Sequence, residues 1–125
     1  MKTTSLVRAL VLTFSLDLAL TACGSDSDTG NGPTNEDAAT IMVNALCTRY
    51  SQCDKTMTAA DITGCKKEAL AQILAGVPAS KQAAANPCSS KELDECSMAI
   101  SVSTCTDVLD DNAPLPTQCT RCSAK

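Results

Sequence analysis

The sequence predicts an all-α fold, a small bundle of four or five short helices stapled by disulfides, after a cleaved signal peptide and a flexible tether. Three observations predict this class. Apolar residues recur at three- and four-residue steps, helix-start signals precede these runs, and no long alternation of polar and apolar residues indicates a strand. The chain has 125 residues, enough for one domain.

The first segment, residues 1–22, has the composition of a secretory signal peptide. Lys2 and Arg8 give it a positive start, and an apolar run follows over residues 9–16. A membrane-spanning helix needs about 20 apolar residues, whereas residues 9–22 would extend only about 21 Å as a helix. The length therefore favours a cleaved signal over a membrane span.

The end of this segment is more specific. Leu20-Thr21-Ala22-Cys23 resembles the lipobox of bacterial lipoproteins. The resemblance implies that the Cys23 thiol carries a diacylglyceryl group, that a signal peptidase cuts before it, and that the new amino terminus is acylated, for example with palmitate. Asp17 departs from the family pattern, because it places a charge inside the apolar segment. The alternative is a plain signal peptide followed by an ordinary cysteine.

Residues 23–36 are predicted to be the lipidated cysteine and a flexible tether. After Cys23 they include no large apolar side chain, so burial cannot offset the entropy of ordering them. Asp26 opens a short likeness to a calcium loop, but Gly30 and Asn31 stand where a ligand and the turn glycine belong. Gly24 follows the cysteine, where the enterobacterial sorting rule has Asp for inner-membrane retention. We therefore expect a lipid-anchored protein of the cell envelope, in the outer membrane rather than the inner membrane.

Helix-start signals divide the rest of the chain, which forms a predicted helical domain over residues 37–125. Folding should begin near Asn35, since Thr34 or Asn35 can cap a first helix. The later starts are Thr58 with Asp61, Ser89 with Glu92, and Thr104 with Asp107. Gly76 and Pro78 should end the second helix, and residues 80–86 should form a short alanine-rich helix stopped by Pro87.

Apolar stripes follow these start signals. The first stripe is Ala39, Val43, Leu46, Cys47, Tyr50 and Cys53; the second is Ile62, Cys65, Ala69, Leu70, Ile73, Leu74 and Val77. The third is Leu93, Cys96 and Ile100, and the fourth is Cys105, Val108 and Leu109. Each stripe predicts the buried face of a helix. Pro114 and Pro116 should end the helical pattern.

Nine cysteines are an odd number, and lipid on Cys23 would leave an even set. The remaining eight are Cys47, Cys53, Cys65, Cys88, Cys96, Cys105, Cys119 and Cys122. They lie on apolar faces, so we expect four disulfides between helices, formed in the oxidising space beyond the inner membrane.

The cysteine spacing gives partial information on the pairing. Cys47 and Cys53 point in different directions on one helix and should find different partners. Cys96 and Cys105 would face opposite sides of one helix, so either the helix breaks at residues 101–103 or these two also diverge. The favoured pairs are Cys53–Cys65, across the turn between the first two helices, and then Cys105–Cys119.

The disulfides should supply much of the stability. The predicted domain has one aromatic residue, Tyr50, and a thin core of scattered aliphatic side chains. Each disulfide typically adds about 2–4 kcal/mol, compared with a net stability of about 5–15 kcal/mol for a small domain. We therefore expect reduction to unfold it.

Composition excludes several chemistries. The chain has no histidine, hence no Ser-His-Asp triad or Cys-His pair, and its net charge of −4 argues against a nucleic-acid partner. The CxxC motif at Cys119 and Cys122 lacks a βαβ context, which favours structural disulfides over a redox pair. The charged doublets, residues 66–67, 94–95 and 110–111, are interpreted as solvated surface. No catalytic residue, metal site or cofactor is predicted.

A second resemblance concerns the cysteine spacing. The pattern of Leu46-Cys47, Tyr50, Cys53, Cys65, Leu93-x-x-Cys96, Cys105 and Pro116-x-x-Cys119 resembles cysteine-rich helical lipoproteins of myxobacterial type. This resemblance implies a cysteine-rich helical fold and a location in the cell envelope, but it implies no activity.

Two functions remain open. The first is a non-enzymatic lipoprotein that acts as a binding or envelope-structural module. Its partner is the membrane through its lipid, and a protein of the envelope is a second candidate partner. The alternative is a periplasmic or surface carrier of a small apolar ligand. Its pocket would lie between helices, lined by Leu70, Ile73, Leu74 and Leu93, and a volume of about 300 Å³ or more would favour it.

Overall fold

The computed structural model describes residues 32–110 and 112–122, and these residues form helices without a strand. The predicted all-α class with disulfide-stapled helices is confirmed. Most of the predicted tether, Cys23 and the signal peptide lie outside the described residues. The elements are α2 (Asn35–Cys53), α3 (Ala59–Ala75), α4 (Ala79–Gln82), α5 (Ser90–Val102), α6 (Cys105–Leu109) and the 3-10 turn η1 (Thr117–Cys119).

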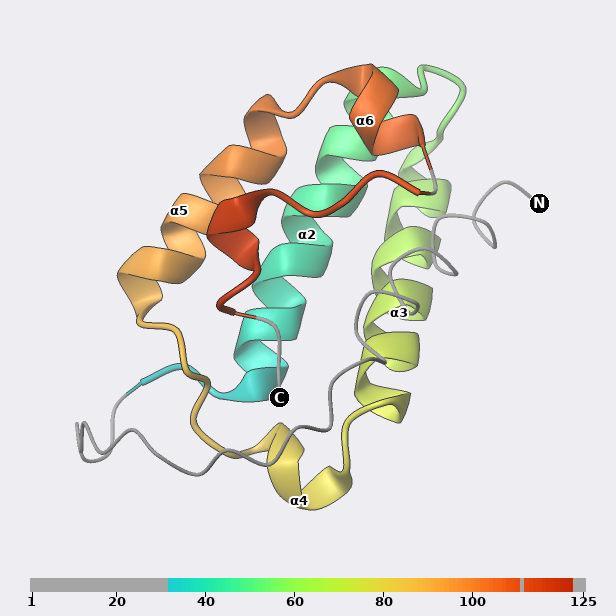
Figure 1. Ribbon diagram of the computed structural model, residues 1–125. Helices are drawn as coiled ribbons and strands as arrows, with labels where there is room; N and C mark the ends of the chain where they lie inside the picture. The colour runs from blue at the N-terminus through green and yellow to red at the C-terminus, as the bar shows by residue number, and fades with distance from the viewer. Residues whose placement is uncertain (1–31, 111, 123–125) are drawn as a thin grey trace.

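Helix α2 is the centre of the bundle (Figure 1). It lies between α3 on one side and α5 on the other, and α6 packs near its C-terminal end. Beyond α6 the chain runs back across α2, and η1 packs against α5. None of the helices in the described part of the chain is long and apolar enough to cross a membrane.

The four predicted helix starts are confirmed. The Thr34 hydroxyl accepts from the Asp37 backbone N–H at 3.1 Å, and the Asp37 carboxylate accepts from the Thr34 N–H at 2.9 Å, which completes a capping box. Equivalent boxes start α3 (Thr58 with Asp61) and α5 (Ser89 with Glu92). The Thr104 hydroxyl caps α6 by accepting from the Asp107 N–H. Because α2 starts at Asn35, the last two residues of the expected tether belong to the helix.

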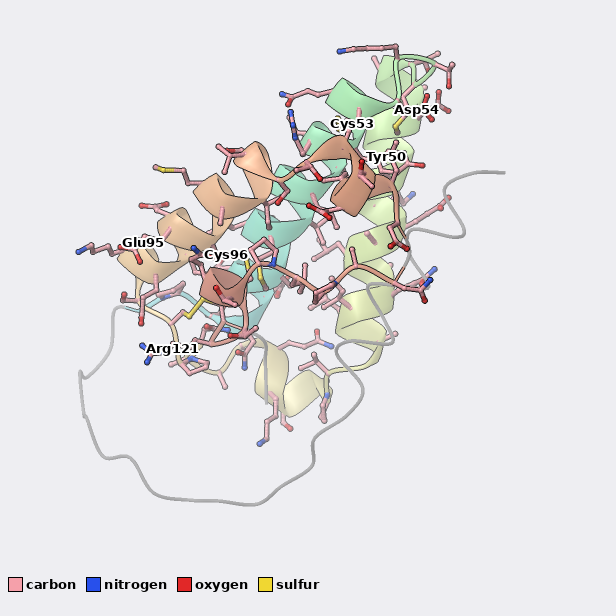
Figure 2. The ribbon with its side chains drawn as sticks, turned by 45° about the horizontal axis from the view of Figure 1, so that its top comes forward. Tyr50, Cys53, Asp54, Glu95, Cys96 and Arg121 are labelled. Atoms are coloured by element: carbon pink, nitrogen blue, oxygen red, sulfur yellow. A yellow bond between two sulfur atoms is a disulfide. The ribbon has the colours of Figure 1, made fainter. Side chains whose placement is uncertain are left out.

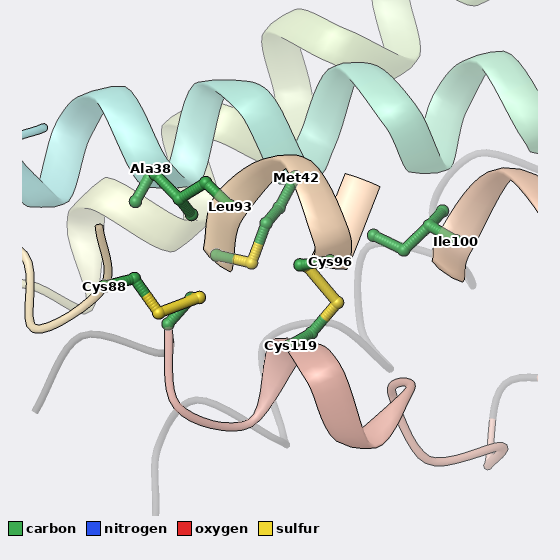
Figure 3. Packing of buried hydrophobic residues seen from close by; sticks show 8 residues of the cluster. Ala38, Met42, Cys88, Leu93, Cys96, Ile100 and Cys119 are labelled. Carbon is green, nitrogen blue, oxygen red and sulfur yellow. A yellow bond between two sulfur atoms is a disulfide. The ribbon is translucent and has the colours of Figure 1, made fainter. Parts of the chain in front are cut away.

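Two buried clusters lie on two faces of α2. The α3-side cluster is Ala39, Val43, Cys47, Cys65, Ala69 and Ile73. The α5-side cluster is Ala38, Met42, Cys88, Leu93, Cys96, Ile100, Cys119 and Cys122 (Figure 3). The predicted stripe of α2 covered only the first face. Ala38 and Met42, which form the second face, are 1% and 5% exposed, so α2 is buried from both sides.

The short helix α4 ends earlier than predicted. It stops at Gln82, and the expected extension to residue 86 is wrong. The reason is a competing backbone pairing. The Asn35 N–H donates to the Ala84 carbonyl at 2.9 Å, and the Asn86 N–H donates to the Pro33 carbonyl at 2.8 Å. These two bonds hold residues 84–86 in an extended bridge beside the start of α2, where a helix cannot continue.

Candidate functional site: the disulfide framework and a polar groove

Four disulfides join the eight cysteines downstream of residue 23. The pairs are Cys47–Cys65, Cys53–Cys105, Cys88–Cys122 and Cys96–Cys119. As predicted, Cys47 and Cys53 find different partners, and so do Cys96 and Cys105. The framework ties α2 to α3 and α6, and ties α5 and the segment before it to the C-terminal turn.

The predicted pair Cys53–Cys65 is wrong, and the geometry of a helical hairpin explains why. Residues opposite each other in antiparallel helices lie equally far from the turn. Cys65 is six residues from the start of α3 at residue 59, and Cys47 is six residues from the end of α2 at residue 53. Cys47 therefore faces Cys65, with a Cα–Cα distance of 6.0 Å. By the same count Cys53, the last residue of α2, lies opposite Ala59, the first residue of α3, and not opposite Cys65.

The predicted pair Cys105–Cys119 is also wrong. Helix α5 ends at Val102 with Ser103 as its C-cap, so the first of the two alternatives, a break at residues 101–103, is the one that occurs. The break turns α6 toward the end of α2, and Cys105 there bonds to Cys53 over a separation of 52 residues. Cys119 lies on η1, which packs against α5, and it bonds to Cys96.

The CxxC motif does not form its own disulfide. Cys119 bonds to Cys96 and Cys122 bonds to Cys88, both within the α5-side cluster (Figure 3). The structural interpretation of this motif is therefore confirmed, because each sulfur is joined to a different part of the chain.

The four disulfides differ in exposure. Six of the cysteines are at most 2% exposed, whereas Cys53 is half-buried and Cys105 is exposed. Figure 2 shows Cys53 near Tyr50 and Asp54 at the end of α2, far along the bundle from Cys96. Cys53–Cys105 is thus the disulfide that a reagent in solution reaches first.

A buried pair of amides, missed at the sequence level, connects three segments. Asn35 and Asn86 are 7% and 8% exposed, and the Asn86 amide donates to the Asn35 Oδ1 at 2.8 Å. The same Nδ2 donates to the Cys122 carbonyl at 3.2 Å, and the Asn86 Oδ1 accepts from the Cys88 N–H at 2.9 Å. The Asn35 amide donates to the Lys81 carbonyl. These bonds tie the start of α2, the bridge after α4 and the C-terminal turn together.

An open groove of about 410 Å³ lies between α2 and α5. Its lining residues are Ile41, Asn44, Ala45, Thr48, Arg49, Gln52, Ser97 and Ser101. Six of the eight are polar or charged, and Arg49 is the charged one. The groove was not predicted, because its polar residues lie outside the apolar stripes from which the helices were inferred.

Arg49 holds a fixed position at one end of this groove. Its Nε and Nη2 donate to the Ser103 carbonyl at 3.0 and 2.8 Å, and its Nη1 donates to the Gln52 Oε1 at 2.9 Å. Ser103 caps the C-terminus of α5, where a cation complements the helix dipole. The guanidinium therefore links the ends of two helices that have no disulfide directly between them.

The charged doublets singled out in the sequence lie on the surface where the structure describes them. Asp94 and Glu95 are exposed, and Glu95 pairs with Lys91 at 3.9 Å. Lys66 is half-buried and Lys67 is exposed. Asp110 is exposed, and its partner in the doublet lies outside the described residues. Within the described part of the chain no three His, Cys, Asp or Glu side chains gather in a way that could hold a metal ion.

The predicted lining of an apolar pocket is wrong. Ile73 belongs to the α3-side cluster, with Leu70 and Leu74 packed against it, whereas Leu93 belongs to the α5-side cluster. Helix α2 separates the two sets, so they cannot line one cavity. The groove between α2 and α5 exceeds the volume expected for a carrier, but it is open to solvent and none of the predicted lining residues borders it.

The fold and its cross-links define a small helical domain stapled by four disulfides. Comparison of the chain with protein-family models, with curated proteins and with solved structures finds no match.

Proposed function

We propose that this protein is a membrane-anchored lipoprotein whose disulfide-stapled helical domain acts as a non-enzymatic binding or envelope-structural module. In this proposal residues 1–22 are a cleaved signal peptide, Cys23 carries the lipid, and the residues up to the start of α2 form the tether. The lipobox-like tetrapeptide ending at Cys23 is the sequence feature on which the anchor rests.

The pairing of the other cysteines is the observation that carries the proposal. The chain has nine cysteines, and eight of them form four disulfides with one another. No partner within the chain is left for Cys23. A single thiol at the fourth position of a lipobox-like motif is what lipidation requires, and four disulfides suit an oxidising compartment outside the cytoplasm.

The charge of the mature chain supports a lipid as the anchor. Removal of Lys2, Arg8 and Asp17 with the signal leaves 10 − 2 = 8 basic and 14 − 1 = 13 acidic residues, a net charge of −5. An acidic surface is repelled by an anionic leaflet, so attachment must come from acyl chains. Two or more chains hold stably, whereas one binds only marginally. Gly24 after the cysteine favours the outer membrane as the destination.

The rigid framework supports a binding or structural role for the domain. Disulfides fix both sides of α2, and the groove beside it presents side-chain donors that the fold itself does not use. Such a scaffold holds a surface in one shape at low entropic cost, which is what recognition of a partner in the envelope needs.

The anchor can be tested directly in a bacterial host. The chain should incorporate an alkyne analogue of palmitate, and intact-mass analysis should find a diacylglyceryl group and an acylated amino terminus at Cys23. Cys23→Ala should abolish the label. As a matched control, the double variant Cys53→Ala/Cys105→Ala removes one disulfide and should still be labelled. A wild-type chain with an unmodified thiol at Cys23, or a labelled Cys23→Ala chain, would refute the lipoprotein proposal.

A further inference from the structure

The groove between α2 and α5 contains more hydrogen-bond donors than the fold uses. A guanidinium carries five N–H groups, and Arg49 spends three of them on Ser103 and Gln52. One N–H therefore remains on Nη1 and one on Nη2. Among the described residues, the side chains of Asn44, Thr48 and Ser97 donate no hydrogen bond, although all three line the groove.

Among the described residues, Arg49 has no carboxylate partner. The two ion pairs among the described residues, Lys91 with Glu95 and Arg121 with Glu92, involve other groups. The described residues that line the groove include no acidic side chain. In a chain with an excess of acidic residues, this half-buried and immobilised guanidinium offers its remaining N–H groups to an anion beside neutral donors.

Apolar side chains border the same groove. On α5, Ser97 and Ser101 line it, whereas the exposed Met98 and Val102 lie about 100° farther around the helix and outside the groove. From α2 the apolar residues Ile41 and Ala45 line it. A ligand seated on Arg49 could therefore cover an apolar surface as well.

We propose that this groove binds a peptide segment of an envelope protein that carries a carboxylate next to an apolar side chain. The carboxylate accepts from the two remaining N–H groups of Arg49 and from neighbouring donors, and the apolar side chain packs on Ile41 and Ala45. This inference rests on the proposed binding role and names its site and ligand class. A lipid phosphate is less suited, because the acidic domain is repelled by an anionic membrane surface.

Arg49 also stabilises the end of α5, so the test needs a variant that spares its contacts. Arg49→Gln removes the charge. Thr48→Phe fills the groove from an exposed position of α2 and leaves the bonds to Ser103 and Gln52 in place. Arg121→Gln is the matched control, because it removes the same charge from an exposed arginine that pairs with Glu92 outside the groove. Thermal melts establish that each variant folds.

The experiment is an NMR titration of the full-length disulfide-bonded chain in detergent. The probe is the peptide acetyl-Gly-Leu-Glu-Leu-Gly amide, and its partner carries Gln in place of Glu. The Glu peptide should saturate and shift amide signals within residues 41–52 and 97–103. The Gln peptide, Arg49→Gln and Thr48→Phe should each weaken binding about tenfold or more, and Arg121→Gln should leave it unchanged.

Several outcomes would overturn the proposal. They are equal affinity for the two peptides, equal loss in Arg49→Gln and Arg121→Gln, full binding by a folded Thr48→Phe chain, and absence of saturation. A further arm uses the Cys23→Ala chain with phosphatidylglycerol vesicles, and vesicle binding that depends on Arg49 without peptide binding would assign the groove to lipid phosphate instead. The lipidation assay is independent of the titration. A failed titration would refute the peptide site and leave the lipid anchor standing, whereas a failed lipidation assay would refute the anchor and leave the peptide site standing.

Discussion

The two sides of α2 are held together in different ways. On the α3 side two long capped helices pack along each other, and one disulfide, Cys47–Cys65, joins them. On the α5 side, α5 packs along α2 and also against a C-terminal segment, in whose described residues the one regular element is the turn η1. That side contains two buried disulfides, Cys88–Cys122 and Cys96–Cys119.

The difference shows where this chain needs covalent bonds. A helix satisfies its own backbone hydrogen bonds and offers a continuous apolar face, so few cross-links suffice between two helices. The C-terminal segment has little regular hydrogen bonding and few large side chains to bury, so ordering it costs conformational entropy that contacts alone do not offset. Disulfides reduce that cost by restricting the unfolded chain, and they also serve as apolar core residues.

The largest expected effect is the loss of all four disulfides. Their combined contribution, at about 2–4 kcal/mol each, matches or exceeds the net stability of a domain of this size, about 5–15 kcal/mol. We expect a chain reduced with a dithiol to lose most of its helical circular dichroism at 25 °C. A reduced chain that keeps the helical signal and melting temperature of the oxidised chain would contradict this.

Removing one disulfide from each side of α2 in turn tests whether the two sides depend differently on their disulfides. Cys47 and Cys65 are 18 residues apart, and Cys96 and Cys119 are 23 apart, so loop entropy alone predicts almost equal losses, within about 0.3 kcal/mol. We expect Cys96→Ala/Cys119→Ala to lose about 1 kcal/mol more than Cys47→Ala/Cys65→Ala, because the C-terminal segment that Cys119 ties to α5 has little regular hydrogen bonding of its own. Urea unfolding of both double variants measures the difference, and equal losses would remove the distinction between the two sides.

The buried amide pair should come next in size. Asn86→Ala leaves the Cys88 N–H and the Cys122 carbonyl without this side-chain partner in a buried region, and we expect a loss of about 2 kcal/mol in the free energy of unfolding. Asn44→Ala is the control, because Asn44 is exposed on α2 and should change stability by less than about 0.5 kcal/mol. Urea unfolding of both variants tests the prediction, which fails if the two lose the same amount.

The smallest expected effect is a loss of stability at acidic pH, caused by protonation of the capping-box carboxylates of α3 and α5. Donation from the Thr58 backbone N–H, and then from its hydroxyl, lowers the pKa of Asp61; Ser89 lowers the pKa of Glu92 in the same way. A lowered folded-state pKa means that the stabilisation is present above the unfolded pKa, about 4, and is lost as pH falls through the folded value. Melting temperature should therefore drop below about pH 4. Asp61→Asn should flatten this drop in melting temperature. Asp94→Asn, which changes an exposed carboxylate outside the capping boxes, should leave the drop unchanged.

The helix starts and the disulfide partners show which parts of the structure could be predicted from the sequence. The helix starts at Thr58 and Ser89 were predictable because a capping box is a local pattern of four residues. The partner of Cys65 was also within reach, since equal distance from a turn identifies Cys47. The partner of Cys105 was not, because it depends on the direction that the chain takes after α5 ends at Val102.

The groove could not have been predicted either. Arg49 and Ser97 are ordinary polar residues in the sequence, and only the packing of α5 along α2 brings them to one surface. The same holds for Asn35 and Asn86, which are 51 residues apart and meet in a buried pair.

The sequence by itself determined the helices, their starts, and the even set of eight cysteines after Cys23, because capping and periodicity act within a few residues and parity is a matter of counting. The tertiary structure alone decided how the six cysteines other than Cys47 and Cys65 pair, that α2 is buried on two faces, and that a polar groove lies beside α5. Those features depend on contacts between residues distant in the chain, and no local pattern specifies the angle at which one helix leaves another.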